Sequence, residues 1–242
     1  KKNTIIKFKS DGTRLIINSE NSVFELNALS ADEFPKFVPL NQANSFELTV
    51  DQIKRIFNKT KFAISAEETR YYLNGVYFHT VKSDDKNILK TVSTDGHRLA
   101  KNELEISSSV DIQGIIMPRK FILQLDKILG DFEGTVKIVS SETQVSFETD
   151  SFIIISKLID GKFPDYEKVI PVENDKLLEI ETDPFFNAVD RVSTVNQDKT
   201  PTVKLVFENN CVKIMATSTE SNKGDEEVQA NYTSQKLEIL FN

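Results

Sequence analysis

Alternating apolar and polar positions occur at the start of the chain and predict short strands. The candidate strands are the runs 5–9, 14–18 and 22–28, of which the last alternates from Phe24 onward, and a Ser-Asp-Gly turn separates the first two runs. Every second side chain of a strand lies on the same face, so Phe24 and Leu26 are expected to share one. We therefore predict three strands in this part of the chain.

A second set of alternating runs follows in the middle of the chain. Residues 70–80 and 88–100 alternate in the manner of strands. The polar runs 83–86 and 218–227 have no apolar period, and we expect them to be solvated loops.

Three segments instead repeat their apolar residues with the period of a helix. The segment 49–57 has a polar start and 181–192 has an Asp-Pro start, both typical of helix N-termini, and 118–129 is a further amphipathic segment. Their apolar side chains should therefore face a core. The positions at helical spacing are Ile53, Ile56 and Phe57; Ile122, Leu125, Ile128 and Leu129; and Phe185, Ala188, Val189 and Val192.

The order of these elements repeats along the chain. Three strands, a Phe-Pro pair and a helix occur twice, and the pairs Phe34-Pro35 and Phe163-Pro164 lie 129 residues apart (163 − 34). A full repeat of roughly 130 residues would contain two helices and about eight strands. The chain starts inside one copy and stops inside another, so we expect a fragment of a longer protein. The repeated unit is an α+β domain, in which sheets would form an outer layer and helices an inner one.

Length and composition indicate a soluble globular protein. With 242 residues and 39% hydrophobic content, the chain can bury a sizeable core, as about two domain equivalents. No apolar run approaches the roughly eighteen residues needed to span a bilayer, so no membrane association is expected. The single cysteine, Cys211, excludes an intramolecular disulfide, is expected to be a small buried hydrophobe, and favours a cytoplasmic location.

Charge is unevenly distributed along the chain. The net charge of −7, taken alone, argues against a nucleic-acid partner. The helical region 51–63, however, carries Lys54, Arg55, Lys59 and Lys61 against one acid. A protein that is acidic overall but basic on one helix face can still bind DNA locally.

Two unusual strings are the candidates for a functional site. The first is TVSTDGHRLA, residues 91–100, in which Asp95-Gly96 predicts a two-residue type I′ hairpin turn. The second is GKFPDYEKVIP, residues 161–171, in which two prolines restrict the backbone. We interpret the two strings as walls of one site. The turn would bring three polar side chains to one rim above an apolar floor: Thr94, His97, Arg98 and, below them, Leu99.

The chemistry of this site allows three interpretations. His97 could be a general base oriented by Asp95, with Arg98 holding an anion, as in a hydrolase. The sequence has no serine or cysteine in a nucleophile motif, and the second histidine, His79, has no further ligand at metal spacing. Alternatively, these residues are ordinary turn formers and strand-end polar groups. The third interpretation is a binding pocket, which the proline-rich string favours because prolines build surfaces and do no chemistry.

Three motifs carry a resemblance to a known family. TVSTDGHRLA, TRYYLNGVYF (residues 69–78) and KFPDYEKVIP (residues 162–171) together resemble the middle domain of the bacterial DNA polymerase III beta subunit, the sliding clamp. The resemblance extends more weakly over the whole chain. It implies a non-catalytic subunit of the polymerase III holoenzyme, without a cofactor or metal, that forms a head-to-tail homodimer when full length. Such a ring encircles duplex DNA as a processivity factor for the polymerase.

The resemblance also implies a domain organisation and partners. Residues 1–45 would be the C-terminal part of a first clamp domain, 46–172 a complete middle domain, and 173–242 the N-terminal part of a third. The expected partners are double-stranded DNA, the polymerase III alpha subunit, the clamp loader and other proteins that carry clamp-binding peptides. A hydrolase that uses His97 and Asp95 remains the alternative.

Residue by residue, the resemblance assigns three surfaces. Lys168 stands where the family commonly has arginine, and Thr194 is more polar than the usual aliphatic residue. The implied peptide-binding residues are Arg70, Tyr72, Leu73, Thr94, Gly96, His97, Arg98, Leu99, Pro164, Lys168, Val169 and Asn242. The implied DNA-binding residues are Lys54, Arg55, Lys59, Lys61, Tyr71, Tyr72, Arg119, Lys120 and Lys127, and the implied dimer interface uses Phe24, Leu26, Thr194 and Val195.

Overall fold

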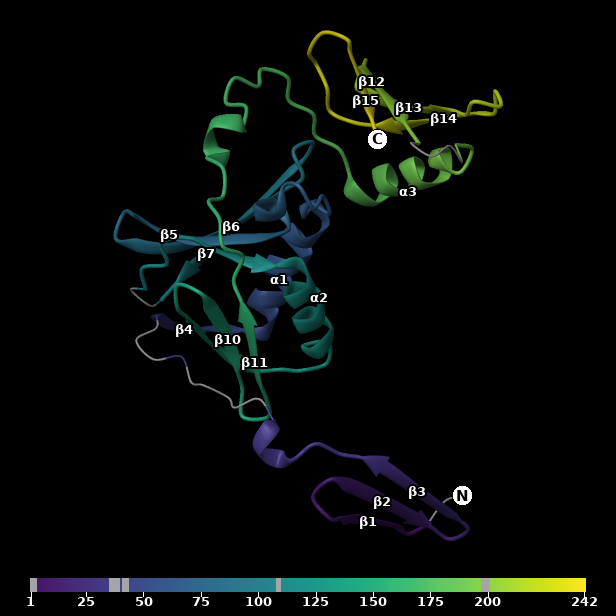
Figure 1. Ribbon diagram of the computed structural model, residues 1–242. Coiled ribbons are helices and arrows are strands. Elements are labelled where there is room, and N and C mark those ends of the chain that lie inside the picture. The colour runs from purple at the N-terminus through teal and green to yellow at the C-terminus, as the bar shows by residue number, and fades with distance from the viewer. Residues whose placement is uncertain (1–3, 35–39, 41–43, 108–109, 197–200) are drawn as a thin grey trace. The chain divides into compact units, whose positions relative to one another are not determined.

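The computed structural model (Figure 1) describes residues 4–34, 40, 44–107, 110–196 and 201–242. The chain divides into two compact units, Lys1–Pro164 and Asp165–Asn242. No helix within these described ranges is both long enough and apolar enough to cross a membrane.

The first three strands form a sheet of their own. β1 (Ile6–Ser10), β2 (Arg14–Ser19) and β3 (Ser22–Asn27) pair antiparallel in the order β1-β2-β3, which confirms the predicted strands. Phe24 and Leu26 lie two positions apart on β3, so they share a face, and both are exposed. A short 3-10 helix, η1 (Ala31–Glu33), follows the sheet.

Residues 44–157 contain, in their described part, the eight strands and two α-helices predicted for one repeat. The strands form two antiparallel sheets of four, in the orders β11-β10-β9-β4 and β7-β6-β5-β8. The Ile159 amide donates to the Ile116 carbonyl (3.0 Å), which links the segment after β11 to β8. The strands are β4 (Asn44–Thr49), β5 (Gly75–Ser83), β6 (Lys86–Thr94), β7 (Leu99–Ile106), β8 (Ile115–Pro118), β9 (Thr135–Ser140), β10 (Gln144–Glu148) and β11 (Ile153–Lys157).

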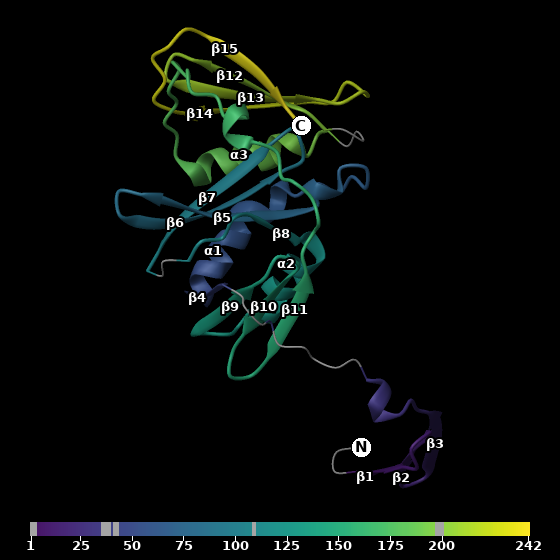
Figure 2. The ribbon, with the colours of Figure 1, turned by 60° about the vertical axis from the view of Figure 1, so that its left-hand side comes forward.

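Helices α1 (Val50–Thr60) and α2 (Arg119–Ile128) lie side by side in this domain (Figures 1 and 2). α1 begins where it was predicted because Thr49 and Gln52 form a capping box. The prediction that Ile128 faces inward was wrong: its side chain is 49% exposed, and Phe121 is buried instead. At 100° per residue, Ile128 lies at the outer edge of the buried stripe of α2.

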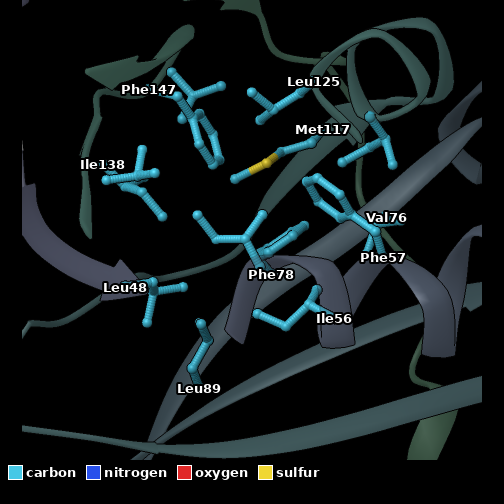
Figure 3. Close-up of a cluster of buried hydrophobic side chains, with 14 of the residues drawn as sticks. Leu48, Ile56, Phe57, Val76, Phe78, Leu89, Met117, Leu125, Ile138 and Phe147 are labelled. Carbon is cyan, nitrogen blue, oxygen red and sulfur yellow. The ribbon is translucent and has the colours of Figure 1, made fainter. Parts of the chain in front are cut away.

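One hydrophobic core holds both sheets and both helices together (Figure 3). Ile56 and Phe57 of α1 and Leu125 of α2 are at most 1% exposed. Burying each such side chain stabilises the fold by about 1.5–3 kcal/mol. The labelled strand residues that surround them are Leu48, Val76, Phe78, Leu89, Met117, Ile138 and Phe147.

The second unit is a four-stranded antiparallel sheet with one helix. Its order is β14-β13-β12-β15, and Ala188 and Val192 of α3 (Thr182–Ser193) contribute to its core. At its start, η4 (Tyr166–Val169) is a short 3-10 helix. The strands are β12 (Val203–Glu208), β13 (Cys211–Thr217), β14 (Lys223–Gln229) and β15 (Leu237–Phe241).

The predicted loop 218–227 is wrong in its second half, because β14 begins at Lys223. The acidic side chains there are balanced by neighbouring elements. Arg191 of α3 binds Glu226 with both Nε (3.0 Å) and Nη2 (2.5 Å), and Lys213 of β13 lies 3.6 Å from Asp225. These cross-element pairs allow a run of acids to pair as a strand.

Two other local predictions also need correction. The predicted strand 70–80 starts only at Gly75, because Tyr71–Leu73 form a 3-10 turn, η3. Within 83–86, Ser83 and Lys86 pair at the strand ends, so the loop consists of Asp84 and Asp85 alone, both with positive φ (47° and 64°). The chain therefore does contain a two-residue hairpin loop of the primed kind, but not at the predicted position.

Candidate functional site

The hairpin between β6 and β7 has a four-residue loop. Thr94 pairs with Leu99, and of the residues between them only Gly96 has a positive φ (+92°), so the predicted two-residue type I′ turn was wrong. The reason is the Asp95 carboxylate. Its Oδ1 accepts from the backbone amides of His97 (3.0 Å) and Arg98 (3.1 Å), which stabilises a wider turn.

Further bonds make this turn rigid. The Arg98 Nε donates to Asp95 Oδ2 (3.0 Å), and the Thr94 hydroxyl donates to the Arg98 carbonyl (2.8 Å) while accepting from the Gly96 amide (3.1 Å). Partial burial acts to raise the pKa of the Asp95 carboxyl. Hydrogen bonds from the His97 and Arg98 amides and from the Arg98 guanidinium outweigh it and lower the pKa overall.

The hydrolase alternative finds no support in this geometry. A general base needs its imidazole oriented by a second group. Asp95 instead bonds the backbone of His97, whose side chain is exposed. Among the described residues, no three His, Cys, Asp or Glu side chains gather in a way that could hold a metal ion.

Arg70 lies against the hairpin turn. A Cβ added at Gly96 would come within 2.6 Å of Arg70 Nη1, so the absence of a side chain there makes room for the guanidinium. Glu67 binds Arg70 through two parallel hydrogen bonds, Nε to Oε2 (2.7 Å) and Nη2 to Oε1 (2.6 Å). These bonds lower the pKa of the Glu67 carboxyl and raise the pKa of Arg70.

The three side chains of the turn η3 differ in how far they are buried. Leu73 is 4% exposed and belongs mostly to the interior, so it contributes less open surface than an apolar floor would need. Tyr72 is half-buried, and a Cβ at Gly161 would lie 3.2 Å from Tyr72 Cβ. Tyr71 is 53% exposed and meets the Tyr72 ring edge to face. η3 therefore contacts the second string at Gly161.

A stack of three rings anchors the second string. Phe163 is parallel to Tyr77 (centroids 4.8 Å apart, 2° between planes), and Tyr77 stacks in turn on His79 (5.0 Å). Burial raises the pKa of the Tyr77 hydroxyl. Pro164, next to Phe163, is exposed. Sequence reasoning missed this stack; the alternation that puts residues 77 and 79 on one strand face was the available signal.

The predicted peptide-binding residues are divided between the two units. Arg70, Tyr72, Leu73, the 94–99 segment and Pro164 belong to the first unit. Lys168, Val169 and Asn242 belong to the second, where Lys168 pairs with Asp165 (2.9 Å) and the other two are exposed. Within the first unit, the contact between Arg70 and Gly96 joins two of the predicted segments.

The predicted DNA-binding cations fall into two groups. Lys54 donates to the Gly130 carbonyl (2.7 Å) and Lys61, the residue after α1, pairs with Asp126 (2.7 Å), so both link the α1 region to the α2 region. The others are exposed and form no hydrogen bond or ion pair through their side chains with any described residue. They are Arg55, Lys59, Arg119, Lys120 and Lys127.

Three of the predicted DNA-binding residues line one hollow. Tyr71, Arg119 and Lys120, with Leu123 and others, surround a cavity of about 570 Å³ beside the first turn of α2. That turn has two cations, no acid and no side-chain cap. The lining of the hollow is mostly apolar, but the two cations at this helix N-terminus are electrostatically unfavourable without an anion, so the start of α2 suits an anionic group.

The predicted interface residues lie at two separate places. Phe24 and Leu26 are exposed on β3. Thr194 and Val195 follow α3 and line a hollow of about 550 Å³ with residues 218–220 and 222–223. The Thr194 hydroxyl donates to the Arg191 carbonyl (2.7 Å), which accounts for a polar residue at this position.

Known proteins match the chain along nearly its whole length. Residues 47–165 match the family "DNA polymerase III beta subunit, central domain" and residues 167–242 match "DNA polymerase III beta subunit, C-terminal domain". The beta sliding clamp of Caulobacter vibrioides is 39% identical over 238 residues, and that of Escherichia coli is 32% identical over 237. Each alignment covers 98% of this chain and 64% of the relative.

The chain also matches solved structures of sliding clamps. A sliding clamp from Bartonella birtlesii bound to griselimycin has a TM-score of 0.89 at 41% identity, covering 99% of this chain and 64% of that one. A Caulobacter crescentus clamp with bound polyethylene glycol has a TM-score of 0.89 at 39% identity with the same coverage. The chain thus spans 64% of the length of these relatives. The clamp fold expected from three motifs is confirmed, and the chain belongs to the DNA polymerase III beta subunit family, the bacterial beta sliding clamps.

Proposed function

We propose that this chain acts in a DNA sliding clamp, a non-catalytic processivity factor that encircles duplex DNA and tethers the replicative polymerase. Family membership supports this role, as do the exposed cations of α1 and α2, which have no partner among the described side chains. Phosphate contacts suit a sliding protein because they carry no sequence information. The proposed setting is the cytoplasm, where the polymerase III holoenzyme works.

We further propose three clamp domains in a head-to-tail homodimer. In this chain, residues 1–45 would end the first domain, 46–172 would form the middle domain and 173–242 would begin the third. Phe24 and Leu26 of one subunit would contact Thr194 and Val195 of the next. Their exposure on β3 and the hollow beside Val195 support this pairing.

The surface around the hairpin turn 94–98 is proposed to capture short peptides from the polymerase alpha subunit, the clamp loader and other replication and repair proteins. The observation that carries this proposal is the rigid turn with Arg70 across Gly96, beside a half-buried Leu99. Such a site combines an apolar anchor with a few fixed polar groups. The parts of Lys168, Val169 and Asn242 in peptide binding, which the family resemblance implies, stay predictions.

The peptide role is tested by Leu99→Asp, which places an unpaired charge at the apolar anchor. We expect fluorescence polarisation to give about micromolar affinity for a labelled clamp-binding peptide of an alpha subunit, because two buried anchors are offset by peptide ordering. Leu99→Asp should abolish this binding. Leu29→Asp, the same change at a side chain that is 80% exposed, is the control. Unchanged binding by Leu99→Asp would show that the site is misassigned.

A further inference from the structure

Two arginines of the proposed peptide site are each bound by a carboxylate three residues earlier in the chain. The pairs are Glu67 with Arg70 and Asp95 with Arg98. Asp95 has a second task, since it also accepts from two backbone amides of the turn. The hydrogen bonds of the Glu67 carboxylate, as far as the structure describes the chain, go to Arg70.

The Glu67–Arg70 ion pair contributes little to the stability of the fold. Its side chains are 52% and 35% exposed, and an exposed ion pair contributes little to stability. Its geometric effect is larger. Two parallel bonds fix the plane of the guanidinium, and Nη1, which takes no part in the ion pair, lies over Gly96.

We propose that Glu67 is a positioning residue of the peptide site: it holds Arg70 with its Nη1 end against Gly96 of the hairpin turn, in the orientation that a bound peptide meets. The inference rests on the proposed peptide-binding function. Without Glu67, Arg70 would sample many rotamers, and peptide binding would have to order it. The N–H groups of Nη1 suit a carbonyl or carboxylate oxygen of the peptide.

The test is a double-mutant cycle on the 242-residue chain, with the same labelled alpha-subunit peptide as probe. We expect Glu67→Ala to weaken binding about 3- to 10-fold, the range for freeing one long side chain. Glu67→Gln, which keeps an acceptor oxygen, should recover part of the loss. In the Arg70→Ala background, Glu67→Ala should change nothing, because its effect passes through Arg70.

The neighbouring acid provides a matched control. Glu68 is exposed and makes no side-chain bond to any residue that the structure describes, so Glu68→Ala removes the same charge without freeing Arg70. The peptide affinity of Glu68→Ala should stay within about 2-fold of the parent, since an exposed charge without a bonded partner is largely screened by solvent and salt. Thermal unfolding should be the same for both alanine variants, which separates positioning from stability.

The outcomes distinguish this inference from the function on which it rests. If Glu67→Ala binds as tightly as the parent or tighter, or weakens binding equally in the Arg70→Ala background, the positioning role is overturned. Loss of binding in Leu99→Asp would then leave the peptide site standing. If the parent itself binds no peptide, or Leu99→Asp binds as the parent does, the peptide site falls and the role of Glu67 falls with it.

Discussion

At the scale of single residues, Asp95 determines the shape of the site. Its carboxylate accepts from two backbone amides and from Arg98, so one side chain sets both the four-residue loop and the direction of a rim arginine. The loop in turn places Gly96 where Arg70 can pack on it. Asp95 is therefore a structural group of the site and has no geometry for catalysis.

The depressed pKa of Asp95 predicts a pH-dependent contribution to stability. Because the folded pKa lies below the unfolded one, the contribution is present above the unfolded pKa and is lost as pH falls through the folded pKa. Asp95→Asn keeps a side-chain oxygen that can accept from the backbone amides but loses the negative charge. Allowing for solvent screening of the exposed Arg98, we expect it to lower the free energy of unfolding by a few tenths to about 1 kcal/mol at pH 7.

Urea unfolding followed by circular dichroism at pH 7 and at about pH 2.5 checks this, since the lower pH lies below the pKa of an unfolded aspartate, where the contribution to stability declines. The difference between parent and Asp95→Asn should shrink toward zero in acid. Asp131→Asn, at an exposed acid that makes no side-chain bond to a described residue, should show no difference at either pH. A deficit in Asp95→Asn that is equally large at both pH values would contradict the assignment.

The misprediction of this turn also has a residue-scale cause. Asp-Gly is a strong signal for a type I′ turn, in which both residues have positive φ. Here only the glycine has a positive φ. An aspartate can instead bond the amides that follow it, and the sequence does not say which option a loop adopts. The same limit applies to Asp84-Asp85, a less typical pair that does adopt positive φ twice.

At the scale of elements, local sequence signals predicted where α1 begins, but they could not predict which distant residues pair. The start of α1 was predictable because Thr49 and Gln52 form a cap within one turn. The link from Lys61 to Asp126 spans 65 residues, and the contact of Arg70 with Gly96 depends on how two separate segments pack. Helix periodicity indicates which side of a helix is polar, but not which polar groups are already used inside the protein.

This division of the cations predicts two kinds of variant. Lys120→Ala should weaken binding to duplex DNA and lower the slope of log affinity against log salt by about 1, because one phosphate contact is lost. Lys54→Ala should leave that slope unchanged and destabilise the domain by about 1 kcal/mol, because it removes the bond to the Gly130 carbonyl.

Fluorescence anisotropy with a labelled duplex of mixed sequence, between 50 and 200 mM salt, measures the first effect, and thermal unfolding measures the second. Each variant serves as the control for the other. If the DNA affinity of the parent did not change with salt, the proposed role of both helices in binding DNA would be wrong. If both variants lowered the slope of log affinity against log salt equally, Lys54 would contact DNA despite its bond to the Gly130 carbonyl.

At the scale of the whole molecule, the repeat predicted from sequence corresponds to a real structural unit. In the part of residues 44–157 that the structure describes, eight strands and two α-helices surround one core, and helix α3 with its sheet forms a second core. The sequence could indicate this because the Phe-Pro pairs and the helix periods recur at offsets that agree within a few residues. It could not indicate ring closure, which depends on contacts between chains; only the family resemblance supplied that expectation.

Ring closure leads to a prediction about topology and not affinity. A protein of the relatives' full length that carries this sequence, once assembled around nicked circular DNA, should remain bound through gel filtration at a salt concentration that abolishes simple binding. The reason is that a closed ring leaves a circle only by opening, whereas phosphate contacts alone dissociate in salt. Cutting the circle once should release the protein, and blocking both new ends with bound protein should retain it. Equal retention on circular and cut DNA would show attachment by contact, and loss from both at high salt would show that no ring encloses the DNA.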